Sequence, residues 1–194
     1  MKNVCVYLII PISFITMSLE QPEVVIVGEV KKLTICVDFG GVISKHSGDN
    51  AEHDNTELDM ENAVSSLQKL HEHHNLMLLS FCGKAKAIKS KMSIINSGNE
   101  NLFDEMIFVK NTKYKNELCL HKGAHIMIDD RVDILDNIKD NNPTIKTILF
   151  GAMESDRHIP AIDWIKVMEI IEGIEYFEPA KIELTKLSKY VYDV

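Results

Sequence analysis

Residues 35–44 read ICVDFGGVIS, an apolar run that ends in a single carboxylate, Asp38, and continues into Gly40 and Gly41. An unpaired charge is costly inside a buried strand, so an acid at this point belongs at the exposed end of the strand or in contact with a partner. Glycine allows the following turn to bring the backbone close to a ligand. The stretch therefore predicts a strand that carries Asp38 to the edge of a sheet. A solvated aspartate before an ordinary glycine turn is the alternative.

Apolar runs and amphipathic stretches alternate after residue 32, which is the pattern of an α/β fold with a parallel sheet covered by helices. The apolar runs are nearly continuous, as expected for strands that are buried on both faces. The expected strands are residues 33–37, 76–80, 106–109, 125–128 and 147–150, with an extra strand at 24–27. The expected helices are residues 58–74, 84–96, 116–120, 132–139 and 164–171, the first with Asp59 and Glu61 in its opening turn.

The composition is that of a globular protein. The 194 residues are 45% hydrophobic and 26% charged, which allows one domain with a proper core. The net charge of −8 argues against non-specific binding to nucleic acid, because no basic stripe is present to neutralise phosphates. A cluster of lysines at 84, 86, 89 and 91 is interpreted as the solvated face of a helix.

The first 30 residues are interpreted as an N-terminal extension or a signal-like segment, ahead of an α/β domain at 31–172 and a tail at 173–194. Residues 4–15 are apolar enough for the core of a signal peptide but too short, and too interrupted by Pro11, for a membrane span. Met17 begins a polar segment, so residues 1–16 also fit an extension from an upstream start codon. The four cysteines, with neither CxxC nor metal-ligand spacing, favour a reducing compartment. We expect a cytoplasmic protein; the alternative is secretion, if residues 1–18 are a signal peptide.

Polar side chains follow several of the expected strands, where ligands bind in open parallel sheets. Asp38 follows the first strand, Ser80 ends the second, and Asp129 and Asp130 follow the fourth. Three converging carboxylates repel one another unless a cation lies between them, and oxygen ligands suit Mg²⁺. Asp38 could then attack phosphorus while Ser80 and a lysine donate to the phosphate oxygens. The lysines that follow the third strand are Lys110, Lys113 and Lys115.

In order and spacing, these residues resemble the four motifs of the haloacid dehalogenase-like superfamily. The motif residues are Asp38 in ICVDFGGVIS, Ser80 in LMLLSF, Lys115 in KYKNELC, and Asp129 and Asp130 in IMIDDRVDIL. Their successive separations are 42, 35 and 14 residues. Each motif alone is weak, but together they are fairly specific and cover residues 32–172. The resemblance implies a three-layer, doubly wound parallel sheet of the Rossmann-like type.

The resemblance also implies the roles of the site residues. Asp38 would be the nucleophile and a magnesium ligand, and Ser80 and Gly41 would bind phosphate. Lys115 would hold Asp38 and the phosphate charge, with Lys113 as a less favoured substitute. The remaining magnesium ligands would be Asp129, Asp130 and the backbone carbonyl of Gly40.

Gly40 departs from the pattern of the family's phosphatases, which carry a second aspartate two residues after the nucleophile as general acid and base. Without it, proton delivery to the leaving group is lost, a contribution of about 10²–10⁴-fold. Three interpretations remain open. One is a slow phosphatase that uses an acidic leaving group or another base, such as His46 or Asp49 in a polar, mobile loop at 44–56. Another is an inactive protein that binds Mg²⁺ and a phosphorylated ligand or a protein partner. The third is a different reaction through Asp38, on a halide, a phosphonate or a sugar phosphate.

The gaps between the motifs are too short for a large cap domain, since each holds little more than one helix. The resemblance therefore implies an open site for a phosphorylated substrate of unknown size. The tail at 173–194 is expected to pack on the sheet as a strand or helix, or to reach a second subunit.

Overall fold

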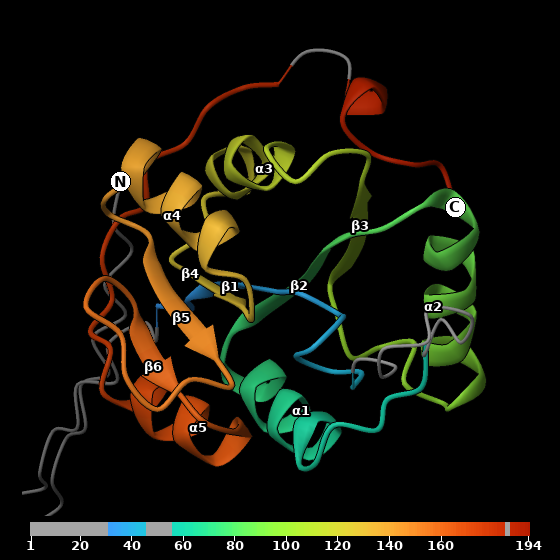
Figure 1. The fold of residues 1–194 in the computed structure, drawn as a ribbon, viewed down its shortest axis with the longest axis horizontal. Helices are drawn as coiled ribbons and strands as arrows, with labels where there is room; N and C mark the ends of the chain where they lie inside the picture. Colours follow the sequence, from blue (N-terminus) through green and yellow to red (C-terminus); the bar gives the residue numbers. More distant parts are fainter. Residues whose placement is uncertain (1–30, 46–55, 185–186) are drawn as a thin grey trace, which may run out of the picture. The chain divides into compact units, whose positions relative to one another are not determined.

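Six short strands form one parallel sheet in the order β3-β2-β1-β4-β5-β6 (Figure 1). This computed structural model describes residues 31–45, 56–184 and 187–194, which all lie in the unit Lys31–Val194. The strands are β1 (Thr34–Val37), β2 (Asn75–Phe81), β3 (Glu105–Val109), β4 (Ile126–Asp129), β5 (Lys146–Phe150) and β6 (Ile159–Ala161). The helices are α1 (Ala63–His73), α2 (Lys84–Asn96), α3 (Tyr114–Lys122), α4 (Val132–Asn141) and α5 (Trp164–Glu172).

Successive strands are added to one side of β1 and then to the other, so the order of the strands switches between β1 and β4. The chain steps outward from β1 through β2 to β3, then returns to the other side of β1 and continues through β4, β5 and β6. In such open sheets the crevice for a ligand lies at this switch, beyond the carboxyl ends of the two central strands. The strands that carry Asp38 and Asp129 are those two.

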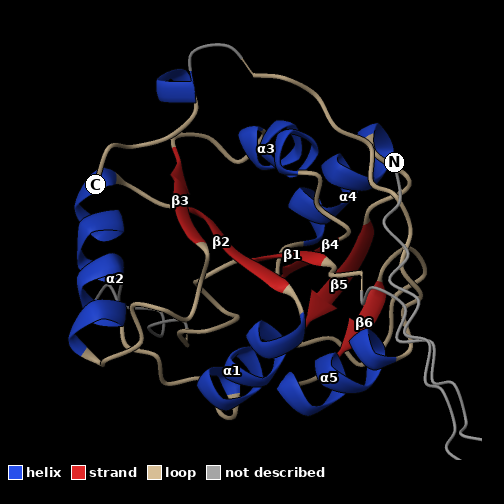
Figure 2. Ribbon diagram, turned by 180° about the vertical axis from the view of Figure 1, so that it is seen from behind, coloured by secondary structure: helices blue, strands red, loops and turns tan. Residues whose placement is uncertain are grey.

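Helices cover both faces of the sheet (Figure 2). The sheet therefore separates the hydrophobic core into two clusters, one on each face. Because successive side chains of a strand point to opposite faces, Ile35 and Val37 pack under α1, α2 and α5, whereas Cys36 packs under α3 and α4. All of these strand residues are buried. The α/β fold class and the three layers expected from the sequence are therefore confirmed, and the described residues include no large cap domain.

The first helix begins later than predicted. Asp59 and Glu61 lie before α1, not in its first turn, which contains no acidic residue. Two tertiary contacts hold this approach to the helix in a non-helical path: the Met60 N–H donates to the carbonyl of Ile43, and Asp59 accepts from the backbone N–H of Lys45 at 2.7 Å. Asn62 adopts the left-handed conformation, with φ 60°, immediately before the helix.

Strand β6 was not predicted from the sequence. It has only three residues, one of which is Pro160, and proline within an apolar run argues against a strand. The strand forms because it lies at the edge of the sheet, where a missing N–H on the outer side removes no ladder hydrogen bond. It extends the sheet by pairing with β5, with Pro160 beside Leu149.

The tail crosses the α3 side of the molecule and ends at the opposite edge of the sheet. Ile182 donates its N–H to the carbonyl of Leu120 in α3, and a single turn of 3₁₀ helix, Leu187–Lys189, precedes an antiparallel bridge between Val191 and Val109 of β3. The tail therefore packs on the sheet edge of its own chain, through a short helical turn and one bridge.

Several predictions lie outside the described residues: the extension or signal-like segment at 1–30 with its strand at 24–27, and the loop residues His46 and Asp49. Among the cysteines of the described residues, Cys36 and Cys119 are buried free thiols. No helix in the described part of the chain is both long and apolar enough to span a bilayer.

Candidate active site

Asp38 stands one residue beyond β1 and still belongs to the hydrogen-bonded sheet, since its N–H donates to the carbonyl of Ile128 in β4 at 3.0 Å. The chain then turns sharply. The N–H groups of Ile43 and Ser44 both donate to the carbonyl of Phe39, and Gly41 takes up φ 76°, which glycine adopts without strain. This loop, residues 39–44, holds Asp38 at the carboxyl end of the central strand β1, where the residue is almost wholly buried.

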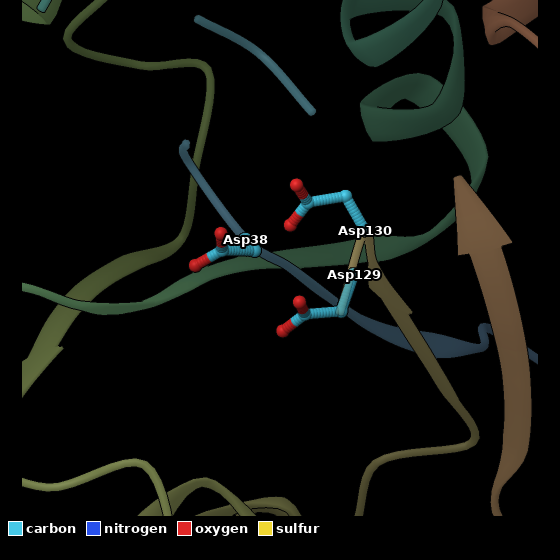
Figure 3. Close-up of side chains that lie close together, drawn as sticks. All are labelled: Asp38, Asp129 and Asp130. Atoms are coloured by element: carbon cyan, nitrogen blue, oxygen red, sulfur yellow. The ribbon is translucent and has the colours of Figure 1, made fainter. Parts of the chain in front are cut away.

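The end of β4 supplies two further carboxylates. Asp129 is the last residue of the strand and is completely buried, and its Oδ1 accepts a hydrogen bond of 3.0 Å from the backbone N–H of Arg131. Asp130 is partly exposed beside it. Each of the residues Asp38, Asp129 and Asp130 offers an oxygen that lies within 4.8 Å of those of the other two (Figure 3). The structure thus brings together the three acids that the sequence predicted.

Lys115 reaches these carboxylates from the first turn of α3, the helix that connects β3 to β4. Its Nζ donates to Asp38 Oδ1 at 2.7 Å and to Asp129 Oδ2 at 2.6 Å, and the residue is only 1% exposed. Lys113, the substitute considered from the sequence, is exposed and lies over the ring of Tyr114. Of these two lysines, Lys115 is the one in contact with the acids.

The charges of this cluster control one another. Burial opposes the ammonium charge of Lys115, but the neighbouring carboxylates of Asp38 and Asp129 outweigh it and raise the pKa of Lys115. Burial raises the pKa of Asp129 as well, against the opposing effect of the Lys115 charge. A single ammonium group therefore faces three carboxyl groups, and it cannot balance the negative charge that the three would carry together.

That unbalanced charge, and the donor set, fit a divalent cation. Carboxylate oxygens are the ligands that Mg²⁺ prefers, and a cation between them would remove the repulsion that the single lysine leaves. The carbonyl oxygen of Gly40 is a further available metal ligand, since it accepts no hydrogen bond within the described part of the chain. The residues present therefore fit the magnesium ion that the resemblance implies.

Ser80 is the second-last residue of β2, the strand that pairs with β1. It is 4% exposed, and its hydroxyl makes no hydrogen bond to any other described residue. A buried hydroxyl normally finds a partner. The Ser80 hydroxyl is therefore available to a ligand at this edge.

Gly41 is engaged within its own loop. Its N–H donates to the carbonyl of Ser44 at 2.7 Å. Its role in phosphate binding stays a prediction, whereas its conformational role in the turn follows from its positive φ.

Sequence reasoning missed how the loop after Asp38 is anchored. The indole N–H of Trp164, a fully buried residue at the start of α5, donates to the carbonyl of Val42 at 2.8 Å. The two residues are 122 positions apart, so no local signal in the sequence could have linked them. This contact connects the last helix to the loop that positions Asp38.

Comparison with known proteins supports the fold. No protein-family model and no curated protein matches the sequence. Among solved structures, a haloacid dehalogenase-like family hydrolase from Streptococcus pneumoniae is similar with a TM-score of 0.54 and 9% identity, over 72% of this chain and 98% of that chain. An uncharacterized protein from Listeria monocytogenes serotype 4b is similar with a TM-score of 0.54 and 15% identity, over 72% of this chain and 97% of the other. At such low identity the likeness carries the fold alone.

Proposed function

The chain has the haloacid dehalogenase-like fold, and we propose that it is a Mg²⁺-dependent phosphohydrolase that works through an aspartyl phosphate on Asp38. The observation that carries this proposal is the Lys115 ammonium group, which is buried between Asp38 and Asp129 at hydrogen-bond distance from both. A lysine in this position fixes the direction of the Asp38 carboxylate, which a carboxylate nucleophile requires.

The first step would form a bond between a carboxylate oxygen of Asp38 and phosphorus, while the bond from phosphorus to the leaving oxygen breaks. Lys115 holds Oδ1, so Oδ2 is the oxygen directed to the reaction. The hydroxyl of Ser80 would donate to a phosphoryl oxygen. Asp38, Asp129, Asp130 and the Gly40 carbonyl would hold Mg²⁺, which when bound supplies Lewis-acid stabilisation of the charge on the phosphoryl oxygens.

The second step would be attack of water on the phosphorus of the aspartyl phosphate. It releases inorganic phosphate and restores the Asp38 carboxylate. The leaving oxygen needs a proton in the first step, and water needs a base in the second. Gly40 has no side chain that could supply either. We therefore expect slow turnover, faster for esters with acidic leaving groups.

The same absence favours a second candidate, an inactive protein that binds Mg²⁺ and a phosphorylated ligand or a protein partner. The two candidates differ in whether Asp38 is phosphorylated and the phosphate is then released, and not in whether Mg²⁺ and a phosphorylated ligand bind.

Two measurements, each made on the wild type and on Asp38→Asn, separate the phosphatase from the binding protein. The first is release of phosphate from 4-nitrophenyl phosphate, with Mg²⁺ and without it. The second is thermal unfolding with Mg²⁺ alone and with Mg²⁺ plus beryllium fluoride, which mimics an aspartyl phosphate and must raise stability if it binds the native state. Asp133→Asn is the matched control, because this exposed carboxylate pairs with Arg131 outside the cluster.

The phosphatase proposal expects turnover and a magnesium-dependent rise in melting temperature, both lost in Asp38→Asn and kept in Asp133→Asn. A rise in melting temperature without any turnover would favour the binding protein. No turnover and no rise would refute both candidates.

A further inference from the structure

A cavity lies beyond the carboxyl ends of β2 and β3, on the side of the sheet where Asp38 follows β1. It has a volume of about 470 Å³ and is lined by Lys84, Lys110, Ser188, Tyr192 and Asp193, among others. This volume is in the range of sites for small molecules. None of the residues proposed to hold phosphate or Mg²⁺ lines it, so it is a separate space.

The sheet places this cavity close to the proposed reaction centre. Lys84 is four residues beyond Ser80 of β2, and Lys110 directly follows the last residue of β3. Strands β1, β2 and β3 are parallel neighbours, so their carboxyl ends lie along one edge about 4.8 Å apart. The cavity is therefore on the order of 10 Å, two strand spacings, from Asp38.

The charge of the cavity wall suits an anion. Lys84 is exposed, and no hydrogen bond or ion pair engages its ammonium group within the described residues. It is the first residue of α2, whose first turn carries no acidic residue and no side-chain cap, so the free N–H groups add positive partial charge there. Lys110 is the second ammonium group, against the single exposed carboxylate of Asp193.

The tail supplies Leu187, Ser188, Val191, Tyr192 and Asp193 to the lining of the cavity. Hydrogen bonds to β3 and to the residue after it hold this part of the tail in place, and Figure 1 shows the C-terminal end of the chain near β3 and α2. The N–H of Lys110 donates to the carbonyl of Tyr190 at 3.0 Å, and its Nζ donates to the carbonyl of Ser188 at 2.8 Å. The N–H of Tyr192 donates to the carbonyl of Phe108 at 2.9 Å. The site has no cap domain among the described residues, so this tail is the element that encloses the rim at β3.

We propose that this cavity binds a second anionic group of the substrate. The substrate class is a phosphorylated small molecule with another phosphate, or a carboxylate, roughly 10 Å from the phosphoryl group that is transferred. The inference rests on the proposed function, since it assumes that the first phosphate binds at Asp38. Lys84 and the positive end of α2 would contact the second group, and Tyr192 would cover the linking atoms.

Three compounds with the same six-carbon chain test this proposal: hexyl phosphate, 1,6-hexanediol bisphosphate and 6-phosphonooxyhexanoate. The quantity measured is the kcat/KM for phosphate release from each compound, together with the Kd of each for the Asp38→Asn protein in Mg²⁺ by calorimetry. The variants are Lys84→Gln, Asp193→Asn and, as the control, Lys89→Gln, which removes the same charge from α2 but does not line the cavity.

We expect the bisphosphate to be preferred to hexyl phosphate by about fivefold or more, as one charge-assisted contact near the surface allows. The preference should fall in Lys84→Gln, rise in Asp193→Asn and stay in Lys89→Gln, and it should shrink as salt is added. If 6-phosphonooxyhexanoate is preferred to hexyl phosphate as strongly as the bisphosphate is, the cavity accepts any anion. If only the bisphosphate is preferred, the cavity is specific for phosphate. Both results support the proposal.

The inference and the proposed function fail in different ways. If hexyl phosphate and the bisphosphate are hydrolysed equally well, the second anion site is refuted while the phosphatase stands. If neither compound is hydrolysed, the phosphatase proposal fails for this class of substrate. The Kd values of hexyl phosphate and the bisphosphate then test the cavity: a difference that depends on Lys84 supports the second anion site, and equal values overturn it. A preference that Lys84→Gln and Lys89→Gln reduce equally also overturns it.

Discussion

Replacing Gly40 by aspartate should supply the acid and base that the site lacks. The backbone of Gly40 is not in the left-handed region, which in the described chain is occupied by Asn62 and four other glycines. A Cβ built on Gly40 meets no heavy atom of the described residues within 4 Å. The Cβ of an aspartate therefore has room at this position, which lies two residues beyond Asp38 in the loop that follows β1.

The expected gain follows from the steps that need a proton. General acid–base catalysis contributes about 10²–10⁴-fold, which lowers the activation free energy by about 3–5 kcal/mol. The cost in stability is small. Repulsion between the new carboxylate and the existing cluster is on the order of 1 kcal/mol near water, and replacing glycine restricts the unfolded chain by a similar amount in the opposite sense.

The assay compares kcat for two esters, 4-nitrophenyl phosphate and hexyl phosphate, in the wild type, Gly40→Asp and Gly40→Asn. The asparagine variant is the matched control, since it has the same size but cannot exchange a proton at neutral pH. Gly40→Asp should raise kcat for hexyl phosphate more than for 4-nitrophenyl phosphate, because the alkoxide needs protonation in order to leave. Gly40→Asn should raise neither.

Two results would refute this reasoning. Equal rates in Gly40→Asp and Gly40→Asn, with both proteins folded and both still stabilised by Mg²⁺ and beryllium fluoride, would show that proton transfer does not limit turnover. A gain that survives in the double variant Asp38→Asn/Gly40→Asp would show that the new acid acts without Asp38 as the nucleophile.

Three further perturbations test the structure of the site and its support. Lys115→Met should destabilise the protein by about 3–5 kcal/mol in urea unfolding, because buried carboxylates lose their only ammonium partner in the cluster; a smaller loss in the double variant with Asp129→Asn is the check, and an equal loss would contradict it. Burial lowers the pKa of His125, whose Nδ1 accepts the N–H of Thr34, so the unfolded chain binds the proton first and stability should fall as the pH drops below about 6.5. His125→Gln should flatten that slope in urea unfolding at pH 5–7, and an unchanged slope would exclude this residue as a source. Trp164→Phe removes the indole donor to the loop after the nucleophile and should cost about 1–3 kcal/mol and reduce kcat; unaltered phosphate release would show that the tether does not position the nucleophile.

The strands and the acids at their ends were predictable because both signals are local. A buried strand needs a short apolar run, and a charge that directly follows such a run lies at the end of the strand. Parallel pairing then brings the ends together without further information, which is why Asp38 and Asp129 meet where the order of the strands switches. The bounds of α2, Lys84–Asn96, were predicted for a similar reason, since its helical apolar pattern is local and stops near Gly98.

The start of α1 and the edge strand β6 were not predictable from local pattern. Residues 59–62 have helix-compatible side chains, but the contacts of Met60 and Asp59 with the loop after Asp38 hold them outside the helix. Pro160 argues against a strand anywhere except at an edge, and only the finished sheet shows where its edge lies.

The amino-acid sequence by itself determined the α/β class, the parallel sheet and the identity of the acids, because each depends on residues that are neighbours along the chain. The resemblance favoured Lys115 over Lys113, and the tertiary structure showed why: Lys115 is buried against the acids, whereas Lys113, just before α3, is exposed. Only the tertiary structure decided that Trp164 holds the loop after Asp38, and that the tail closes a cationic cavity beside β3. These features join residues far apart in the chain, and the distance between such residues is set by packing and not by any pattern in the sequence.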